Sequence, residues 1–142
     1  MAMTTILLDA NVILDVWDPD PVWQAWSSSQ MRSLSLLNEL AINPIVYSEI
    51  SVSFATPSAL DDKLADLGVV VVDIPRHAAF LAGKAYAQYR RRGGTKTNVL
   101  PDFFIGAHAA VLGCPLLTRD TRRYAAYFPT VRLIAPSPNL VK

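Results

Sequence analysis

Apolar residues occur along the chain in short, nearly unbroken runs rather than in strict alternation with polar ones. Such runs are typical of parallel strands that are covered on both faces of a sheet. They predict five strands, which cover Thr5–Leu8, Ile42–Val46, Val69–Ile74, Pro115–Thr118 and Val131–Ala135.

The segments between these runs carry apolar residues at helical spacing. They predict helices over Val22–Leu40, Ser48–Leu67 (broken at Pro57), Arg76–Arg92, Asp102–Leu112 and Thr121–Phe128. Strands that alternate with helices predict an α/β fold in which a central parallel sheet has helices on both faces. We expect a single domain over residues 1–142, with a frayed tail from 136 to 142. Asp15, Asp18 and Asp20 are interpreted as the polar start of a loop.

Composition narrows the class of protein. Hydrophobic residues make up 51% of the 142 residues and charged residues only 18%, below the typical charged share of about 25%. Two explanations fit this sparing use of charge: a large core, or a surface covered by a partner chain. The single cysteine, Cys114, excludes an internal disulfide and fits the reducing cytoplasm. The longest uncharged apolar stretch, Phe103–Leu117, is 15 residues long, too short for a membrane span of about 20 residues.

Four acids occupy related positions in this predicted layout. Asp9 ends the first strand, Glu49 follows the second, Asp102 opens a helix, and Asp120 follows the fourth strand. Ligand sites of open parallel sheets lie outside the carboxyl ends of the strands. Carboxylates gathered there would repel one another, and a divalent cation reverses that penalty. Mg²⁺ and Mn²⁺ prefer oxygen ligands, so the pattern indicates a metal site suited to phosphate chemistry.

Each acid also has an ordinary structural explanation. Asp102 and Asp120 stand where helix-capping acids are common, Asp9 can cap the turn that follows it, and Glu49 fits an exposed helix position. Only the alignment of all four with strand ends favours a shared site. The two histidines, His77 and His108, have no His or Cys neighbours at the spacing of metal ligands and are not expected to bind metal.

At these residues the chain resembles the PIN-domain family, and within it the VapC-type toxins of bacterial toxin–antitoxin pairs. The matching stretches are "LLDANVILDV", "NPIVYSEISVSFAT", "RRRGGTKTNVLPDFFIGAHAAVLG" and "PLLTRDTRRYAAYFPTVRLIAP". The resemblance implies a metal-dependent endoribonuclease, homodimeric and inhibited by a cognate antitoxin. It places the family's acidic site on Asp9, Glu49, Asp102 and Asp120, as ligands of Mg²⁺ or Mn²⁺. It places the supporting polar positions on Asn11 and Thr118.

Cationic residues are distributed unevenly. Seven of the 13 lie in the segment from 90 to 123. They are candidates for contact with RNA phosphates, whose neutralisation dominates nucleic-acid affinity: Arg90, Arg91, Arg92, Lys96, Arg119, Arg122 and Arg123. The first four equally fit a solvated helix end with favourable dipole placement, and one of the last three could pair with a site acid.

Two other functions compete with a nuclease. A receiver-like phosphoacceptor domain also has an acidic Mg²⁺ pocket on a parallel sheet, but it requires an adjacent acidic pair after the first strand and a late lysine. "LLDAN" has one acid and "LLTRD" has no lysine, so the sequence argues against it. A PIN-like scaffold that binds RNA or an antitoxin without catalysis is the remaining alternative, and the intact acids disfavour it.

Overall fold

The computed structural model describes residues 4–137, so most of the predicted frayed tail lies outside the described residues. The sheet is parallel throughout, and its strands lie in the order β3-β2-β1-β4-β5. Their bounds are Thr4–Leu8 (β1), Asn38–Ile42 (β2), Val69–Val71 (β3), Leu116–Leu117 (β4) and Leu133–Ile134 (β5). The predicted α/β class is confirmed.

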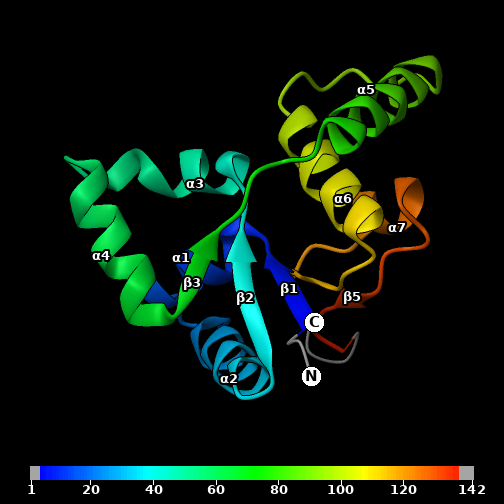
Figure 1. Cartoon of the computed structure of the whole chain (residues 1–142). Helices are drawn as coiled ribbons and strands as arrows, with labels where there is room; N and C mark the ends of the chain where they lie inside the picture. Colours follow the sequence, from blue (N-terminus) through cyan, green and yellow to red (C-terminus); the bar gives the residue numbers. More distant parts are fainter. Residues whose placement is uncertain (1–3, 138–142) are drawn as a thin grey trace.

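Seven α-helices and one 3-10 turn, Ser51–Ser53, connect these strands in the described part of the chain. The α-helices are Ala10–Trp17 (α1), Gln24–Ser35 (α2), Pro44–Ile50 (α3), Pro57–Leu67 (α4), Arg76–Arg91 (α5), Leu100–Leu112 (α6) and Arg122–Tyr127 (α7). In Figure 1, α3 and α4 lie to the left of the sheet, and α5, α6 and α7 lie to its right. Within the described residues, no helix is long and apolar enough to cross a membrane.

Two predicted elements are shifted in the structure. The second strand ends at Ile42, where the prediction began it, and the predicted helix over Val22–Leu40 ends at Ser35. The reason is a strong helix start at residue 43: the Asn43 side chain accepts a hydrogen bond from the Val46 amide at 3.0 Å, and a proline follows Asn43. An asparagine N-cap followed by proline favours a helix over a strand. The apolar run therefore divides between β2 and α3.

The first helix was not predicted. α1 begins directly after β1, because the Asp9 carboxylate caps it by accepting a hydrogen bond from the Ala10 amide at 2.8 Å. Val12 and Ile13 on this helix are fully buried. Asp15 also lies in α1 and is buried, so its interpretation as the start of a loop is wrong.

The strand order determines where the side chains at the strand ends lie. β1 is central, with β2 on one side and β4 on the other. The chain leaves β1 toward β2, and β4 pairs with the opposite edge of β1, so the sheet has its topological switch point at the carboxyl end of β1. Crevices that hold ligands form at such points in open α/β sheets. Asp9 stands there, one residue beyond the strand.

The helices to the right of the sheet pack through aromatic rings. Phe103 of α6 is fully buried and contacts Tyr127 at 5.2 Å, Tyr89 at 5.7 Å and Phe128 at 6.2 Å between ring centroids. One turn after Phe103, Gly106 lets the Phe128 ring approach the helix backbone. A Cβ at Gly106 would lie 2.4 Å from that ring. Close packing here holds α7 against α6.

We predict that Gly106→Ala lowers the free energy of unfolding by about 1–3 kcal/mol, because the buried Phe128 ring has no room to move aside. Gly83→Ala is the matched control: Gly83 lies in α5 and a Cβ there meets no atom within 4 Å. It should raise the stability by about 0.5–1 kcal/mol through the higher helix propensity of alanine. Urea denaturation of both variants measures the difference, and equal effects would contradict the packing described.

Candidate functional site

Asp9 is brought beside the end of β4 by main-chain pairing. Leu8 is in register with Leu117, and the Asp9 amide donates a hydrogen bond to the Leu117 carbonyl at 3.0 Å. Thr118 therefore leaves β4 next to the Asp9 side chain. Two segments more than a hundred residues apart in sequence meet at the carboxyl edge of the sheet.

The Asp9 carboxylate is almost completely buried and fully hydrogen-bonded. Thr118 Oγ1 donates to Asp9 Oδ2 at 2.8 Å, and the Tyr124 hydroxyl donates to the same oxygen at 2.9 Å. The Ala10 amide donates to Oδ1, and Asn11 Nδ2 donates weakly to Oδ2 at 3.4 Å. Burial raises the pKa of the Asp9 carboxyl group, and these hydrogen bonds oppose the rise. The side chain is thereby fixed in one orientation.

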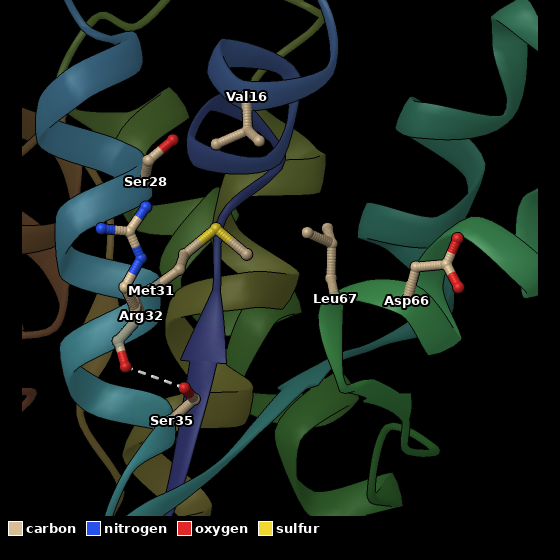
Figure 2. A pocket seen from close by; sticks show the side chains of 7 residues that line it. All are labelled: Val16, Ser28, Met31, Arg32, Ser35, Asp66 and Leu67. Atoms are coloured by element: carbon tan, nitrogen blue, oxygen red, sulfur yellow. Dashed lines mark hydrogen bonds between the residues drawn. The ribbon is translucent and has the colours of Figure 1, made fainter.

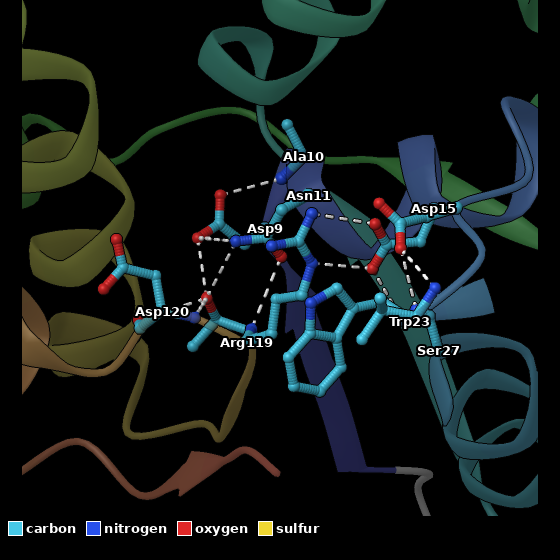
Figure 3. A network of polar contacts seen from close by, with 11 residues as sticks. Asp9, Ala10, Asn11, Asp15, Trp23, Ser27, Arg119 and Asp120 are labelled. Carbon is cyan, nitrogen blue, oxygen red and sulfur yellow. Dashed lines mark hydrogen bonds and ion pairs between the residues drawn. The ribbon is translucent and has the colours of Figure 1, made fainter. Parts of the chain in front are cut away.

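Asn11 and Thr118, the supporting positions expected from the sequence, both hydrogen-bond to Asp9, and Figure 3 shows Asn11 beside Asp9. Thr118 Oγ1 accepts from the Asp120 amide at 3.1 Å and from Asn11 Nδ2 at 3.3 Å. The Asn11 carbonyl oxygen accepts from the Arg119 amide at 3.4 Å. The segment after β4 is thus tied to the start of α1, and Asp120 is placed close to Asp9.

Tyr124 is a residue of this network that sequence reasoning missed. It lies in α7 and is almost fully buried. Burial, followed by the charge of Asp9, raises the pKa of its hydroxyl group, which therefore stays protonated and can donate. In the sequence it appears only as an apolar position of a short helix, four residues after Asp120. That spacing is the one signal that could have found it.

Glu49 and Asp102 approach Asp9 from two helices, α3 and the first turn of α6. Glu49 is exposed over the residue as a whole, but neighbouring protein removes part of its hydration. This raises the pKa of its carboxyl group to about 7, and the charges of Asp9 and Asp102 contribute further. Burial and the charges of Asp9 and Asp120 likewise raise the pKa of Asp102. The four predicted acids therefore share one electrostatic field.

One cation partly neutralises this field. Arg123 Nη1 of α7 donates to Asp102 Oδ2, and both side chains are partly buried. The Arg123 charge lowers the pKa of Asp102 and opposes the effect of the other acids. Arg123 is thus the residue, foreseen among the last three arginines, that pairs with a site acid.

The anchoring of α3 involves a buried histidine. Asn43, which caps α3, also contacts His108 Nδ1 of α6 through its amide nitrogen at 3.2 Å. Both residues are fully buried, and burial lowers the pKa of His108. The contact holds the start of α3 against α6, the two helices that carry Glu49 and Asp102. His108 is therefore a structural residue here, and it was not expected to bind metal.

The donor set fits Mg²⁺ or Mn²⁺ by its chemistry, since it consists of carboxylate oxygens that repel one another and that Arg123 neutralises only at Asp102. Within the described residues, no group of three or more His, Cys, Asp or Glu side chains is placed so that it could hold a metal ion by itself. Mg²⁺ does not require such a group, because it keeps several waters and is commonly held by one or two carboxylates.

Arg119 makes a different contact from the one expected. Its Nε and Nη2 atoms donate to the two carboxylate oxygens of Asp15, each at 2.9 Å, and Ser27 Oγ donates to Asp15 at 2.7 Å (Figure 3). The guanidinium group also lies 5.6 Å from the ring centroid of Trp23. This candidate for phosphate contact is therefore held by a buried acid.

A separate cavity lies between α1, α2 and the end of α4 (Figure 2). Its volume is about 320 Å³, and Met31 and Leu67 supply apolar side chains to its wall while Arg32 and Asp66 supply charges. None of the predicted site residues lines it. The acidic cluster and this cavity are different surfaces of the molecule.

Comparison with known proteins identifies the fold. The family model "PIN domain" matches residues 6–129. One similar solved structure is VapBC2 from Rickettsia felis bound to a promoter DNA fragment, with 21% identity over 94% of this chain and 99% of that one and a TM-score of 0.69. Another is FitAcB from Neisseria gonorrhoeae, with 22% identity over 91% of this chain and 96% of that one and a TM-score of 0.66. VapBC-1 from nontypeable Haemophilus influenzae is also similar, with 22% identity over 92% of this chain and 97% of that one and a TM-score of 0.66. No curated protein sequence gave a match.

The Asp15–Arg119 pair yields a stability prediction. Asp15→Ala should lower the free energy of unfolding by about 2–3 kcal/mol, because it leaves a partly buried guanidinium group without its partner. Asp18→Ala, an exposed change at the end of the same helix, should stay within about 0.5 kcal/mol of the wild type. Chemical denaturation measures both, and similar small losses would show that the pair is not structural.

The acidic cluster yields a pH prediction. Because the pKa of Glu49 is raised from 4.5 to about 7 in the folded protein, the folded state binds this proton more tightly than the unfolded chain. Stability without metal should therefore fall as pH rises from about 4.5 to about 7. Glu49→Gln should remove part of this fall, on the order of 1 kcal/mol after screening by solvent.

Melting temperatures measured at pH 5 and pH 8 in a chelating buffer provide the test. Glu39→Gln, a change at an exposed glutamate on β2, is the matched control and should keep the wild-type pH dependence. If the melting temperature of Glu49→Gln falls between pH 5 and pH 8 as much as that of the wild type, Glu49 lies outside the electrostatic field of the other acids.

Proposed function

Because the chain belongs to the PIN-domain family, we propose that it is a metal-dependent endoribonuclease that acts as the toxin of a toxin–antitoxin pair. PIN domains of the VapC type are generally nucleases. The observation that carries the proposal is the fixed, buried Asp9 carboxylate, whose field reaches the three other acids at the carboxyl edge of the sheet.

In this proposal Asp9, Glu49, Asp102 and Asp120 hold Mg²⁺ or Mn²⁺, directly or through water. When bound, the ion would polarise the phosphodiester and lower the pKa of a water molecule. Asn11, Thr118 and Tyr124 orient Asp9 through hydrogen bonds to its Oδ2 atom. Such supporting partners commonly change metal affinity or activity by about 10–100-fold when they are replaced. The pKa of Glu49 is raised to about 7 in the metal-free protein, and a bound cation would favour its ionised form.

We further propose RNA as the substrate, a cognate antitoxin as partner, and a homodimer as the form of the toxin. Structurally similar proteins include a toxin–antitoxin complex from Klebsiella pneumoniae and VapBC-5 from Mycobacterium tuberculosis, a member of the VapBC family of toxin–antitoxin systems. The chain also exposes large apolar side chains, among them Leu36, Leu37, Val52 and Phe80. Leu36 and Leu37 are adjacent in the chain, and contact of such apolar side chains with a partner would agree with the low charged fraction of the sequence.

Cleavage of RNA by the purified chain, free of any partner, tests the proposed function. The chain should cut single-stranded RNA in Mg²⁺ or Mn²⁺ and lose this activity with a chelator. Asp9→Asn should abolish cleavage, and Tyr124→Phe should lower the rate by about tenfold because Asp9 loses one orienting hydrogen bond.

Asp18→Asn is the matched control, since Asp18 is an exposed acid on the loop side of α1, and it should cut like the wild type. Circular dichroism should show that all variants are folded. Cleavage that persists in the chelator, or in Asp9→Asn, would overturn the metal-site assignment. RNA binding with no cleavage under any metal condition would favour the scaffold function.

A further inference from the structure

A cationic pocket adjoins the acidic cluster. Its volume is about 290 Å³, and it is lined by Tyr89, Lys96, Asp120, Arg122, Arg123 and Tyr127. Asp120 and Arg123 belong to both places: Asp120 is a predicted site acid, and Arg123 pairs with Asp102. The pocket therefore opens directly beside the carboxylates.

The loop after α5 holds Lys96 in this pocket. The Tyr89 hydroxyl accepts a hydrogen bond from the Lys96 amide at 3.1 Å. Gly94 lies so close to the Tyr89 ring that a Cβ there would be 2.4 Å from it, and its amide donates to the Tyr89 carbonyl at 2.9 Å. These contacts fold the loop back over Tyr89 and bring a cation beside the ring.

The two tyrosines are also held in place. Tyr89 and Tyr127 meet edge to face at 6.2 Å, and both rest on the buried Phe103 ring. The Arg92 guanidinium group lies 5.5 Å from the Tyr127 ring centroid. Both tyrosines remain partly exposed. Ring surface that is fixed before binding can contact a planar ligand at little cost in side-chain entropy.

The charges of the pocket select an anion. Arg123 is paired with Asp102, but Lys96 and Arg122 still outnumber the single carboxylate of Asp120 that lines the pocket. An RNA strand that reaches the acidic cluster must overcome repulsion by four carboxylates, so cations are needed next to it. Of the seven basic residues in this part of the sequence, these three line the pocket, whereas Arg119 is held by Asp15.

We propose that the cationic pocket is a subsite for one nucleotide of an RNA strand whose neighbouring phosphodiester lies at the acidic cluster. The inference rests on the proposed function and names how its substrate is held. The cations contact the phosphate, and the tyrosine rings contact the base, a combination typical of sites for single-stranded nucleic acid. The volume, near the lower end of small-ligand pockets, suits one nucleotide and not a longer segment.

RNA binding in the non-cleaving Asp9→Asn background tests the subsite. Lys96→Ser with Arg122→Ser removes two pocket cations, both exposed. Arg76→Ser with Lys84→Ser is the matched control, since it removes one arginine and one lysine from exposed positions of α5 that do not line the pocket. Affinity for a labelled single-stranded RNA is measured across a salt series for each protein.

The pocket double variant should bind about tenfold more weakly at physiological salt, and its slope of log affinity against log salt should fall by about 1.4, or 0.7 for each lost phosphate contact. The control should change by less than about twofold. Equal losses in both variants would show diffuse attraction by surface charge and overturn the subsite.

Competition experiments identify the occupant. Uridine 5′-monophosphate should displace the RNA better than ribose 5-phosphate or inorganic phosphate, because only the nucleotide offers a base to the tyrosines. If all three compounds displace the RNA equally well, the pocket binds anions without contacting a base, and the nucleotide subsite is overturned. If the pocket variant keeps RNA binding but loses binding to polyglutamate, the occupant is an acidic protein segment and the proposal fails.

Cleavage by the wild-type chain separates this inference from the proposed function. Cleavage with no difference between the two double variants would overturn the subsite and leave the nuclease intact. Pocket-dependent RNA binding in a chain that never cleaves would leave the subsite intact and overturn the nuclease.

Discussion

Two hydroxyl groups, those of Thr118 and Tyr124, donate hydrogen bonds to one oxygen of Asp9 from positions 109 and 115 residues away in sequence. The rest of the candidate site depends on these contacts. They place a carboxylate inside the protein at the switch point of the sheet, where burial alone would disfavour its charge. Asp120 and Arg123 then follow from the same segment, because they are neighbours of the two hydroxyl residues in the chain. The geometry of the acids is thus a consequence of how the region after β4 packs on β1.

Much of the fold could be predicted from the sequence because parallel strands and long helices leave strong patterns. The runs at β1 and β4 and the helix that became α5 are close to their predicted positions. The errors occur where one local interaction outweighs the apolar pattern. At residue 43 an asparagine cap followed by proline converts a predicted strand into α3. After Leu8 the cap formed by Asp9 starts a helix that is too short to show a clear period.

The candidate site was predictable to a similar extent. The acids could be chosen because three were expected to follow strands and the fourth, Asp102, to open a helix, and Asn11 and Thr118 because of the family resemblance. Tyr124 was missed, since a tyrosine that donates a buried hydrogen bond and one that only packs in the core look alike in a sequence. The arginines could not be sorted either. Arg119, Arg122 and Arg123 lie within five positions, yet Arg119 pairs with a buried acid, whereas Arg122 and Arg123 line a pocket and Arg123 also pairs with a site acid. Only three-dimensional contacts separate them.

The helix that supplies Tyr124 and Arg123 is only six residues long, and its start is capped only by a long hydrogen bond of 3.4 Å from the Arg122 amide to Asp120 Oδ1. It is followed by β5, a strand of two residues. Such a segment opens at a smaller free-energy cost than the central strands, as local unfolding does in other proteins. Each opening removes the hydrogen bond to Asp9 and the ion pair to Asp102 together. We therefore expect α7 to set the lifetime of the assembled acid cluster, so that slow exchange of the amide hydrogens in β1 coexists with faster loss and recovery of the cluster.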